Sequence, residues 1–353
     1  MLHRNNSWPH PPMHWLRLAR RAPLLAALLL ALAAAGAARA ADDLPVLHAD
    51  ANRTTVSGLS SGGFMAVQYG VAFSASVRGV GVIAGGPYLC AWLPVNGGIE
   101  GCMGGAPVGS ASWGAALMQA ALGQIDPAAG LAAQRIYLFS GTHDETVKPP
   151  VMAATRDFYV AAGVPPARLQ WVGRLPAGHA FLAPDFGGAC GSNGPPYIER
   201  CTVRGQPYDQ PKAVLQHLQG RLKPPAEPLS ATVRPFDQRV FGIEASGLDA
   251  TGFVYVPQAC QPQGRGCAVH VVFHGCRQGA AVVGSDVYKS AGYNRWADSN
   301  RLIVLYPQAV ATQVPFNPKG CWDWWGYTSP VFATRSGVQL SAIRAMVERL
   351  TQP

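Results

Sequence analysis

The stretch TTVSGLSSGG at residues 54–63 decides the fold of this chain. Its centre, Gly58 to Gly62, matches the pattern G-x-S-x-G, in which a sharp turn between a strand and a helix lifts one serine out of a sheet. A strand-like apolar run precedes the motif, and the helix-like run Gly63–Val71 follows it. This context predicts that Ser60 is a nucleophile; the alternative is a simple glycine turn.

The residue after the predicted nucleophile is also a serine, Ser61, but the frame of the motif selects Ser60. A serine at the start of a helix lies beside free backbone N–H groups and the positive end of the helix dipole, which favour developing negative charge. We therefore expect Ser61 to donate its backbone N–H to the oxyanion of an ester-hydrolysis intermediate.

A nucleophilic serine needs a base, and the base needs an orienting carboxylate. In α/β-hydrolases the acid and then the histidine follow the serine, each in a loop after a strand. Asp144 follows the strand-like run Arg135–Phe139, with Glu145 as the alternative acid, and His179 follows the run Leu169–Val172. The sequence therefore predicts Asp144 as the acid and His179 as the base.

A second motif, VFHGC at residues 272–276, resembles the HG motif that ends a strand of esterases and supplies an oxyanion N–H. We expect the Cys276 N–H to be the donor that acts together with Ser61. The alternative is that His274 and Gly275 only turn the chain.

Strand-like and helix-like runs alternate along the chain, which predicts an α/β fold with a mostly parallel central sheet and helices on both faces. Residues 190–230, rich in proline, are expected to form a surface connection, and Gln238–Ile243 and Gly252–Val256 to be antiparallel neighbours. The predicted strands are Arg53–Val56, Val77–Ile83, Arg135–Phe139, Leu169–Val172, Gln238–Ile243, Gly252–Val256, Ala268–Phe273 and Leu302–Leu305, and the predicted helices are Gly63–Val71, Ser112–Leu122, Val151–Ala162 and Gly337–Arg349.

The order of the motifs is unusual. In an ordinary α/β-hydrolase the oxyanion strand precedes the nucleophile, whereas here the oxyanion loop near residue 275 comes after the nucleophile, the acid and the base. The simplest interpretation is a circularly permuted α/β-hydrolase fold, with the conventional strands five to eight leading and one to four trailing.

The first forty residues are expected to be a secretory signal peptide. They hold five arginines and no acid, then an apolar run from Ala22 to about Ala35, and then the small-x-small sequence Ala38-Arg39-Ala40. The apolar run is shorter than the roughly 20 residues that a membrane span needs. We therefore expect cleavage after Ala40, a single catalytic domain at residues 41–353, secretion to the periplasm or medium, and no membrane association afterwards.

The charge of the mature chain argues against nucleic-acid binding. The whole chain carries 28 basic and 19 acidic residues, for a net charge of +9. Without the five arginines of residues 1–40, 23 basic residues face the same 19 acids, a net charge of +4 with no basic block.

Eight cysteines follow residue 40, and an even number in an exported chain predicts disulfides. Metal binding is the competitor, but no two of the cysteines form a C-x-x-C pair and no histidines stand at ligand spacing, so no metal is expected. The spacing favours neighbour pairing, which gives Cys90 with Cys102, Cys190 with Cys201, Cys260 with Cys267, and Cys276 with Cys321.

The G-x-S-x-G motif, the positions of Asp144 and His179, and the late His274-Gly275-Cys276 loop resemble those of poly(3-hydroxybutyrate) depolymerases in which the oxyanion residue follows the serine motif. The resemblance runs from about residue 52 to 351. It implies hydrolysis of an aliphatic polyester to oligomers or monomers, without a cofactor. Many bacterial members carry a C-terminal polymer-adsorbing domain with no counterpart before Pro353, so the resemblance does not extend to efficient attack on crystalline polymer.

Several aromatic residues are candidates for polyester binding, because flat apolar rings suit a weakly polar repeat. Core packing is the alternative for all of them. They are Tyr88, Trp322, Trp324 and Trp325, with Trp92 and Tyr327 beside them in sequence.

Two other functions stay open at this point. One is an esterase of similar fold that acts on feruloyl or acetyl-xylan esters. The other is a non-catalytic polyester- or carbohydrate-binding protein with a relic site. The chain is expected to be a monomer whose partner is the polyester polymer or oligomer.

Overall fold

An eight-stranded sheet forms the centre of the computed structural model, which describes residues 42–353. β10 pairs antiparallel with β11, and β11 antiparallel with β13, while all other neighbours are parallel. The prediction of a mostly parallel central sheet is confirmed. In sheet order the strands are β10 (Val233–Asp237), β11 (Thr251–Tyr255), β13 (Leu302–Tyr306), β12 (Ala268–Phe273), β1 (Thr54–Leu59), β2 (Val77–Ile83), β3 (Arg135–Phe139) and β4 (Leu169–Val172).

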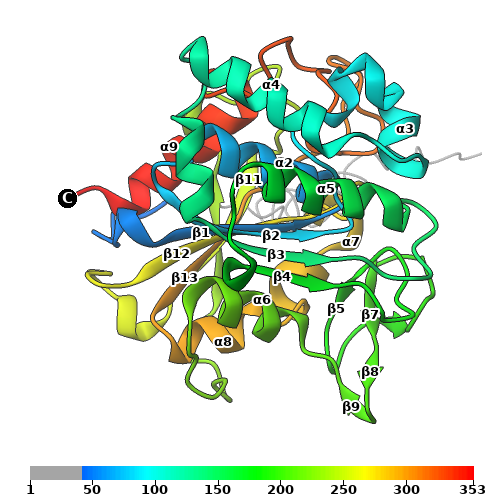
Figure 1. Ribbon diagram of the computed structural model, residues 1–353. Helices are drawn as coiled ribbons and strands as arrows, with labels where there is room; N and C mark the ends of the chain where they lie inside the picture. The colour runs from blue at the N-terminus through cyan, green and yellow to red at the C-terminus, as the bar shows by residue number, and fades with distance from the viewer. Residues whose placement is uncertain (1–41) are drawn as a thin grey trace, which may run out of the picture. The chain divides into compact units, whose positions relative to one another are not determined.

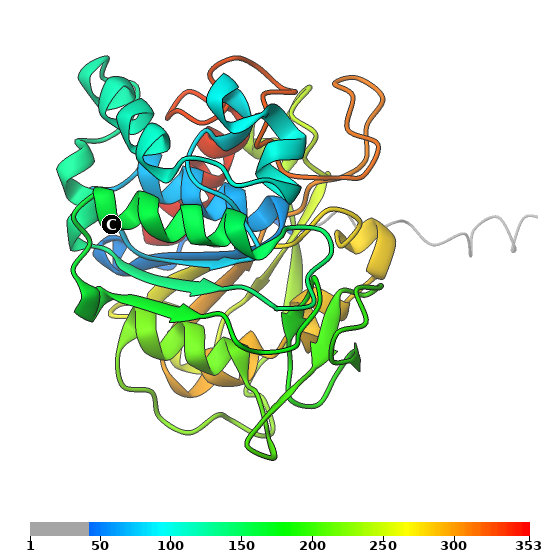
Figure 2. The same ribbon diagram turned by 45° about the vertical axis from the view of Figure 1, so that its right-hand side comes forward.

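Helices cover both faces of the sheet (Figures 1 and 2). On one face lie α2 (Ser61–Ala72), α4 (Gly109–Ala121), α5 (Pro149–Ala161) and α9 (Val338–Thr351), and on the other lie α6 (Gln210–Gln219) and α8 (Tyr293–Ser299). Smaller elements are α3 (Gly98–Gly104), α7 (Ala280–Val283), β5 (Phe181–Leu182), β6 (Gly188–Ala189), β7 (Ile198–Arg200), β8 (Thr202–Val203) and β9 (Gln206–Pro207).

The central strands form where β-branched residues can be buried on both sides at once. Every residue of β1, β12 and β13 is buried. Side chains on one face pack against α2 and α9, and those on the other face pack against α6 and α8, so the sheet separates two apolar cores. Burial on both faces explains why these strands read as continuous apolar runs in the sequence.

The predicted strand Gln238–Ile243 is wrong. The strand is Val233–Asp237, and residues 239–241 form a turn of 3-10 helix. The Gln238 side chain donates to the carbonyls of Asp249 and Gln308 and accepts from the Gln308 N–H, which holds the chain at the point where it leaves the sheet. β10 tolerates Pro235 because it lies at the edge of the sheet.

The prediction of a surface connection at residues 190–230 is wrong in part. Ile198 and Glu199 on β7 are fully buried, and Val214, Leu215 and Leu218 of α6 pack under the sheet. The prolines that suggested a loop are compatible with this packing because Pro211 lies in the first turn of α6, where no intrahelical N–H is needed.

The strands from the second half of the chain lie together on one side of β1, and those from the first half lie on the other. The two ends of the described chain also meet, since the Ala49 N–H donates to the Leu350 carbonyl over 3.1 Å. This arrangement is the one that the permuted order implies. The circular permutation itself stays a prediction.

Residues 41–353 form one compact unit, and the predicted signal peptide, residues 1–40, lies outside the described residues. Across the part of the chain that the structure describes, no helix combines the length and apolar character that crossing a membrane requires. All four disulfides pair as predicted.

Candidate active site

Ser60 lies at the turn between β1 and the first residue of α2. Its backbone has φ 59° and ψ −124°, a conformation that residues with a side chain rarely adopt and that a sharp strand-to-helix turn requires. The turn packs directly on β12: a Cβ atom on Gly62 would lie 2.3 Å from the Phe273 carbonyl oxygen. The glycine in this part of the motif therefore permits the close contact between the turn and the neighbouring strand.

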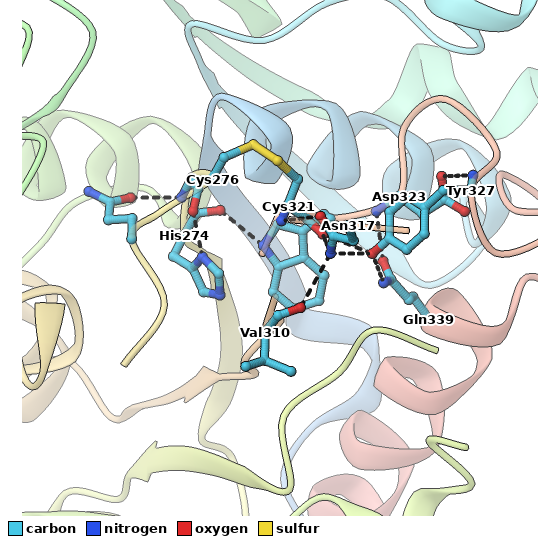
Figure 3. Close-up of a disulfide and its surroundings, with 11 residues drawn as sticks. His274, Cys276, Val310, Asn317, Cys321, Asp323, Tyr327 and Gln339 are labelled. Atoms are coloured by element: carbon cyan, nitrogen blue, oxygen red, sulfur yellow. Dashed lines mark hydrogen bonds between the residues drawn. A yellow bond between two sulfur atoms is a disulfide. The ribbon is translucent and has the colours of Figure 1, made fainter. Parts of the chain in front are cut away.

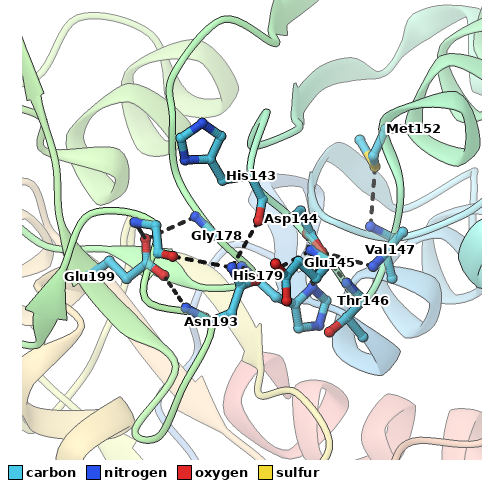
Figure 4. Close-up of polar contacts among 12 residues, drawn as sticks. His143, Asp144, Glu145, Thr146, Val147, Met152, Gly178, His179, Asn193 and Glu199 are labelled. Atoms are coloured by element: carbon cyan, nitrogen blue, oxygen red, sulfur yellow. Dashed lines mark hydrogen bonds and ion pairs between the residues drawn. The ribbon is translucent and has the colours of Figure 1, made fainter.

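His179 and Asp144 form a buried pair (Figure 4). The His179 Nδ1 lies 2.9 Å from Oδ2 of Asp144 and 3.1 Å from its Oδ1. Oδ1 also accepts the N–H groups of Thr146 and Val147, both at 2.8 Å, which fixes the carboxylate. The neighbouring acid, Glu145, is exposed. Of the two candidate acids, Asp144 is therefore the one that holds the imidazole.

A cavity of about 480 Å³ brings Ser60 and His179 together with Ser61 and Cys276. In residues 42–353 no hydrogen bond joins the Ser60 hydroxyl to the His179 ring, and such contacts often tighten only when substrate binds. The other lining residues are Phe64, Ile99, Met103, Thr146, Val147, Tyr197, Arg277, Phe316, Asn317, Pro318, Lys319, Cys321, Trp324 and Trp325.

The loop that carries Cys276 is held on both sides (Figure 3). Its Sγ is bonded to Cys321, and the Gly275 N–H donates to Gln278 over 2.7 Å. His274 is buried, and its Nε2 accepts the Ala309 N–H over 3.0 Å, so Nδ1 carries the proton and donates to the Gly275 carbonyl. Burial lowers the pKa of His274 to about 4, so the ring is neutral at pH 7 and keeps this bonding pattern.

Two of the four predicted substrate-binding aromatics line the cavity. These two are Trp324 and Trp325. Trp324 stacks on Phe64 with ring centroids 4.2 Å apart. The prediction is wrong for Trp322 and Tyr88, which are fully buried away from the cavity. The Trp322 Nε1 donates to the His274 carbonyl, and the Tyr88 hydroxyl donates to the Ala333 carbonyl, so both belong to the core.

The carboxylate of Asp323 holds the backbone that follows Trp324, including that of Trp325. It accepts backbone N–H groups from residues 325–328, the shortest over 2.7 Å from Gly326, and the Thr328 hydroxyl over 2.6 Å. Burial raises the pKa of the Asp323 carboxyl, while these hydrogen bonds act in the opposite direction.

Sequence reasoning missed several apolar residues that line the cavity, among them Ile99, Met103 and Phe316. It also missed Glu199 and Asn193, which contact the loops of His179 and Asp144. The predicted disulfides could have drawn attention to three of these residues, because Cys90–Cys102 encloses Ile99 and Cys190–Cys201 encloses Asn193 and Glu199.

Comparisons of sequence link the chain to known enzymes, although no protein-family model matches it. A poly(3-hydroxybutyrate) depolymerase of Delftia acidovorans is 43% identical over 329 residues, which cover 91% of this chain and 64% of that protein's length. A polyhydroxybutyrate depolymerase of Talaromyces funiculosus is 39% identical over 342 residues, which cover 90% of this chain and 96% of that protein.

Comparisons of structure point the same way. The crystal structure of PHB depolymerase from Penicillium funiculosum matches with a TM-score of 0.79 and 35% identity, over 88% of this chain and 98% of that one. A serine-to-alanine variant of a PHB depolymerase, complexed with an R3HB trimer, matches over the same shares with a TM-score of 0.80. The chain therefore belongs to the poly(3-hydroxybutyrate) depolymerase family.

Proposed function

We propose that the chain hydrolyses poly(3-hydroxybutyrate) and similar polyesters with short side chains, through an acyl-enzyme on Ser60. Ser60 Oγ attacks the ester carbonyl while His179 takes its proton, and the protonated ring then gives that proton to the leaving alcohol. Asp144 orients the ring. Water, activated by His179, then attacks the acyl-enzyme and releases the acid and free Ser60.

Two backbone donors stabilise the charge that develops on the carbonyl oxygen. Ser61 and Cys276 both line the cavity beside Ser60, and their N–H groups are the proposed oxyanion hole. The Cys276–Cys321 disulfide keeps one donor in place, and the helix N-terminus at Ser61 keeps the other.

The observation that carries the proposal is the strained turn at Ser60 in one cavity with the buried His179–Asp144 pair. The lining supports a polyester as the substrate, because Phe64, Trp324 and Trp325 offer apolar surface to a neutral, methyl-bearing repeat. The names of the two sequence relatives support the same substrate.

The test replaces Ser60 with alanine and measures turnover of a short-chain p-nitrophenyl ester. Loss of the nucleophile is expected to lower kcat by at least about a thousandfold. Ser112→Ala, which removes another buried hydroxyl, is the matched control and keeps its activity. Retained turnover by Ser60→Ala would exclude the mechanism.

The substrate is tested separately on the wild-type protein with amorphous poly(3-hydroxybutyrate) and with feruloylated xylan. Release of 3-hydroxybutyrate oligomers or monomers supports the polyester assignment. Release of ferulate alone contradicts it and favours a carbohydrate esterase.

We also propose that the chain is secreted as a monomer after cleavage behind Ala40. The four disulfides support an oxidising destination, since such bonds persist outside the cytosol. N-terminal sequencing of protein from the medium and periplasm, together with sedimentation, tests the cleavage site, the destination and the monomeric state. A mature N-terminus other than Ala41, or a dimer, contradicts this proposal.

A further inference from the structure

Glu199 is a carboxylate for which the proposed reaction has no use. It lies on β7 and is fully buried. Within residues 42–353 no lysine, arginine or histidine forms an ion pair with it. A buried charge without a cation needs several hydrogen bonds to offset its lost hydration. The partners of Glu199 therefore show what the carboxylate stabilises.

All of its partners belong to the loops that surround His179 (Figure 4). Oε2 accepts the N–H groups of Gly178 over 3.0 Å and Gly191 over 2.7 Å. Oε1 accepts the Asn193 N–H over 3.1 Å and the Ser192 hydroxyl over 3.4 Å. Glu199 thus holds the residue before His179 and the segment 191–193 against each other.

The Asn193 side chain extends this contact to both members of the catalytic pair. Its Oδ1 accepts the His179 N–H over 2.8 Å and the Glu145 N–H over 3.3 Å. Its Nδ2 donates to the His143 carbonyl over 2.8 Å. Asn193 therefore fixes the backbone of His179 and the residues on either side of Asp144.

The local backbone is built to admit this group. A Cβ atom on Gly178 would lie 2.6 Å from Oε1 of Glu199 and 2.7 Å from Nδ2 of Asn193, so only glycine permits the approach. The Cys190–Cys201 disulfide closes the loop that carries both Asn193 and Glu199. These features keep the carboxylate and the amide close to His179.

We propose that Glu199 is a positioning residue, which acts through Asn193 to hold His179 and Asp144 in the geometry that proton transfer requires. The inference rests on the proposed function of that pair. It predicts a specific defect, because a misplaced base slows the chemical step without weakening the contacts that bind the substrate.

The test is Glu199→Gln, which keeps the size of the side chain but turns an NH2 group toward backbone N–H donors. With a p-nitrophenyl ester, kcat is expected to fall about 10- to 100-fold, as for a catalytic group misplaced by about 1 Å, while KM changes less than about twofold. The NMR resonance of the proton between Asp144 and His179 is expected to shift or broaden.

The matched control is Gln210→Ala. Gln210 is also fully buried, and its Oε1 accepts the N–H of Leu182, three residues after His179, but it makes no contact with the His179–Asp144 pair. It is expected to lose stability without losing kcat. If Glu199→Gln matches it, with lower Tm and kcat within twofold of wild type, Glu199 is only structural and the proposal is overturned.

Asn193→Ala provides an independent variant if Glu199→Gln does not fold, because Asn193 is only half-buried. It is expected to show the same loss of kcat at constant KM, and normal kcat overturns the proposal. If both single variants fold, the double variant should lose little more kcat than the more impaired single variant, since Glu199 is proposed to act through Asn193. Fully additive losses contradict that proposal.

The outcome is separable from that of the proposed function. If the wild-type protein hydrolyses the p-nitrophenyl ester but no polyester, the substrate assignment fails while the role of Glu199 is still tested. If Ser60→Ala retains turnover, the nucleophile assignment itself is wrong.

Discussion

The two sides of the cavity use different chemistry to hold their catalytic groups. We call residues 141–147 and 174–193 the base-side loops, and residues 274–279 and 317–328 the oxyanion-side loops. Each side has a buried carboxylate that accepts several hydrogen bonds, Glu199 for the base-side loops and Asp323 for the oxyanion-side loops. The two oxyanion-side loops are joined to each other by the Cys276–Cys321 disulfide. The two base-side loops are joined to each other by hydrogen bonds, and the Cys190–Cys201 disulfide links one of them only to the residue after β7.

This difference fits the task of each side. The oxyanion donor must be ready before charge develops, so a covalent link that removes loop motion suits it. The base must accept and release a proton during each turnover, and hydrogen bonds hold its backbone while the ring stays free to exchange that proton. Gln278 of the oxyanion-side loops accepts the Gly275 N–H and donates to the carbonyl of Tyr197, which lies just after the base-side loops.

The largest expected effect comes from breaking the covalent link. Cys276→Ala with Cys321→Ala opens a 45-residue loop and is expected to cost about 4 kcal/mol of stability by chain entropy. Displacing one oxyanion donor should also lower kcat about 100-fold. Denaturant unfolding and ester turnover measure the two effects.

The matched control is Cys260→Ala with Cys267→Ala, a disulfide that spans seven residues and does not line the cavity. It should cost about 2 kcal/mol and leave kcat unchanged. Equal kcat for the two double variants would show that hydrogen bonds alone hold the oxyanion-side loops.

An effect of the same order is expected from acid. Burial lowers the pKa of His274 to about 4 and that of His270 to about 3, so the unfolded chain binds protons at these residues between about pH 6.5 and pH 4 while the folded chain does not. The stability present at neutral pH is therefore lost as the pH falls through this window. Each histidine contributes about 3 kcal/mol over that range.

Unfolding free energies of His274→Gln and His270→Gln at several pH values separate the two contributions. Between about pH 6.5 and pH 4 the free energy of unfolding falls as the pH is lowered, and each substitution should remove roughly half of that slope, since each eliminates one of two similar proton-binding sites. Only His274→Gln should also lower kcat, because His270 lies inside the sheet, bonded to Thr55 and Ser57. An unchanged slope in both variants would locate the acid sensitivity elsewhere.

The smallest effect is expected from Asp323→Asn. It weakens the hydrogen bonds that hold the backbone at Trp325 and Gly326 but leaves the base-side loops intact. KM for a 3-hydroxybutyrate oligomer should rise about three- to tenfold, the equivalent of one neutral hydrogen bond, while kcat changes less than twofold. The opposite pattern in Asp323→Asn, a kcat loss at constant KM, would remove the distinction between the two carboxylates.

The sequence predicted the parts of the site that depend on local chain geometry. Ser60 was identifiable because a strand, a turn and a helix follow one another within a few residues. β2, β3, β4 and β12 have the predicted bounds. In β12 every residue is buried, and burial on both faces leaves a continuous apolar run that is easy to recognise.

The missed parts depend on contacts across the fold. Glu199 is one of three acids in the proline-rich residues 190–230, and apart from the two cysteines that enclose it nothing near it in sequence indicates that it is buried under the His179 loop. Trp322 and Trp324 stand two residues apart in one aromatic block, yet one packs in the core and the other lines the cavity. Composition alone does not separate these environments.

The central position of β1 sets a constraint on how the protein is made. The ribosome delivers Ser60, Asp144 and His179 early, but β12, which pairs with β1 over a separation of about 215 residues, follows much later. Until β12 and its Cys276 loop have been synthesised, the nascent chain has all three residues of the proposed triad but an unfinished sheet and only one of the two proposed oxyanion donors. Such distant pairing predicts slow folding, with activity that appears only after β12 has paired with β1.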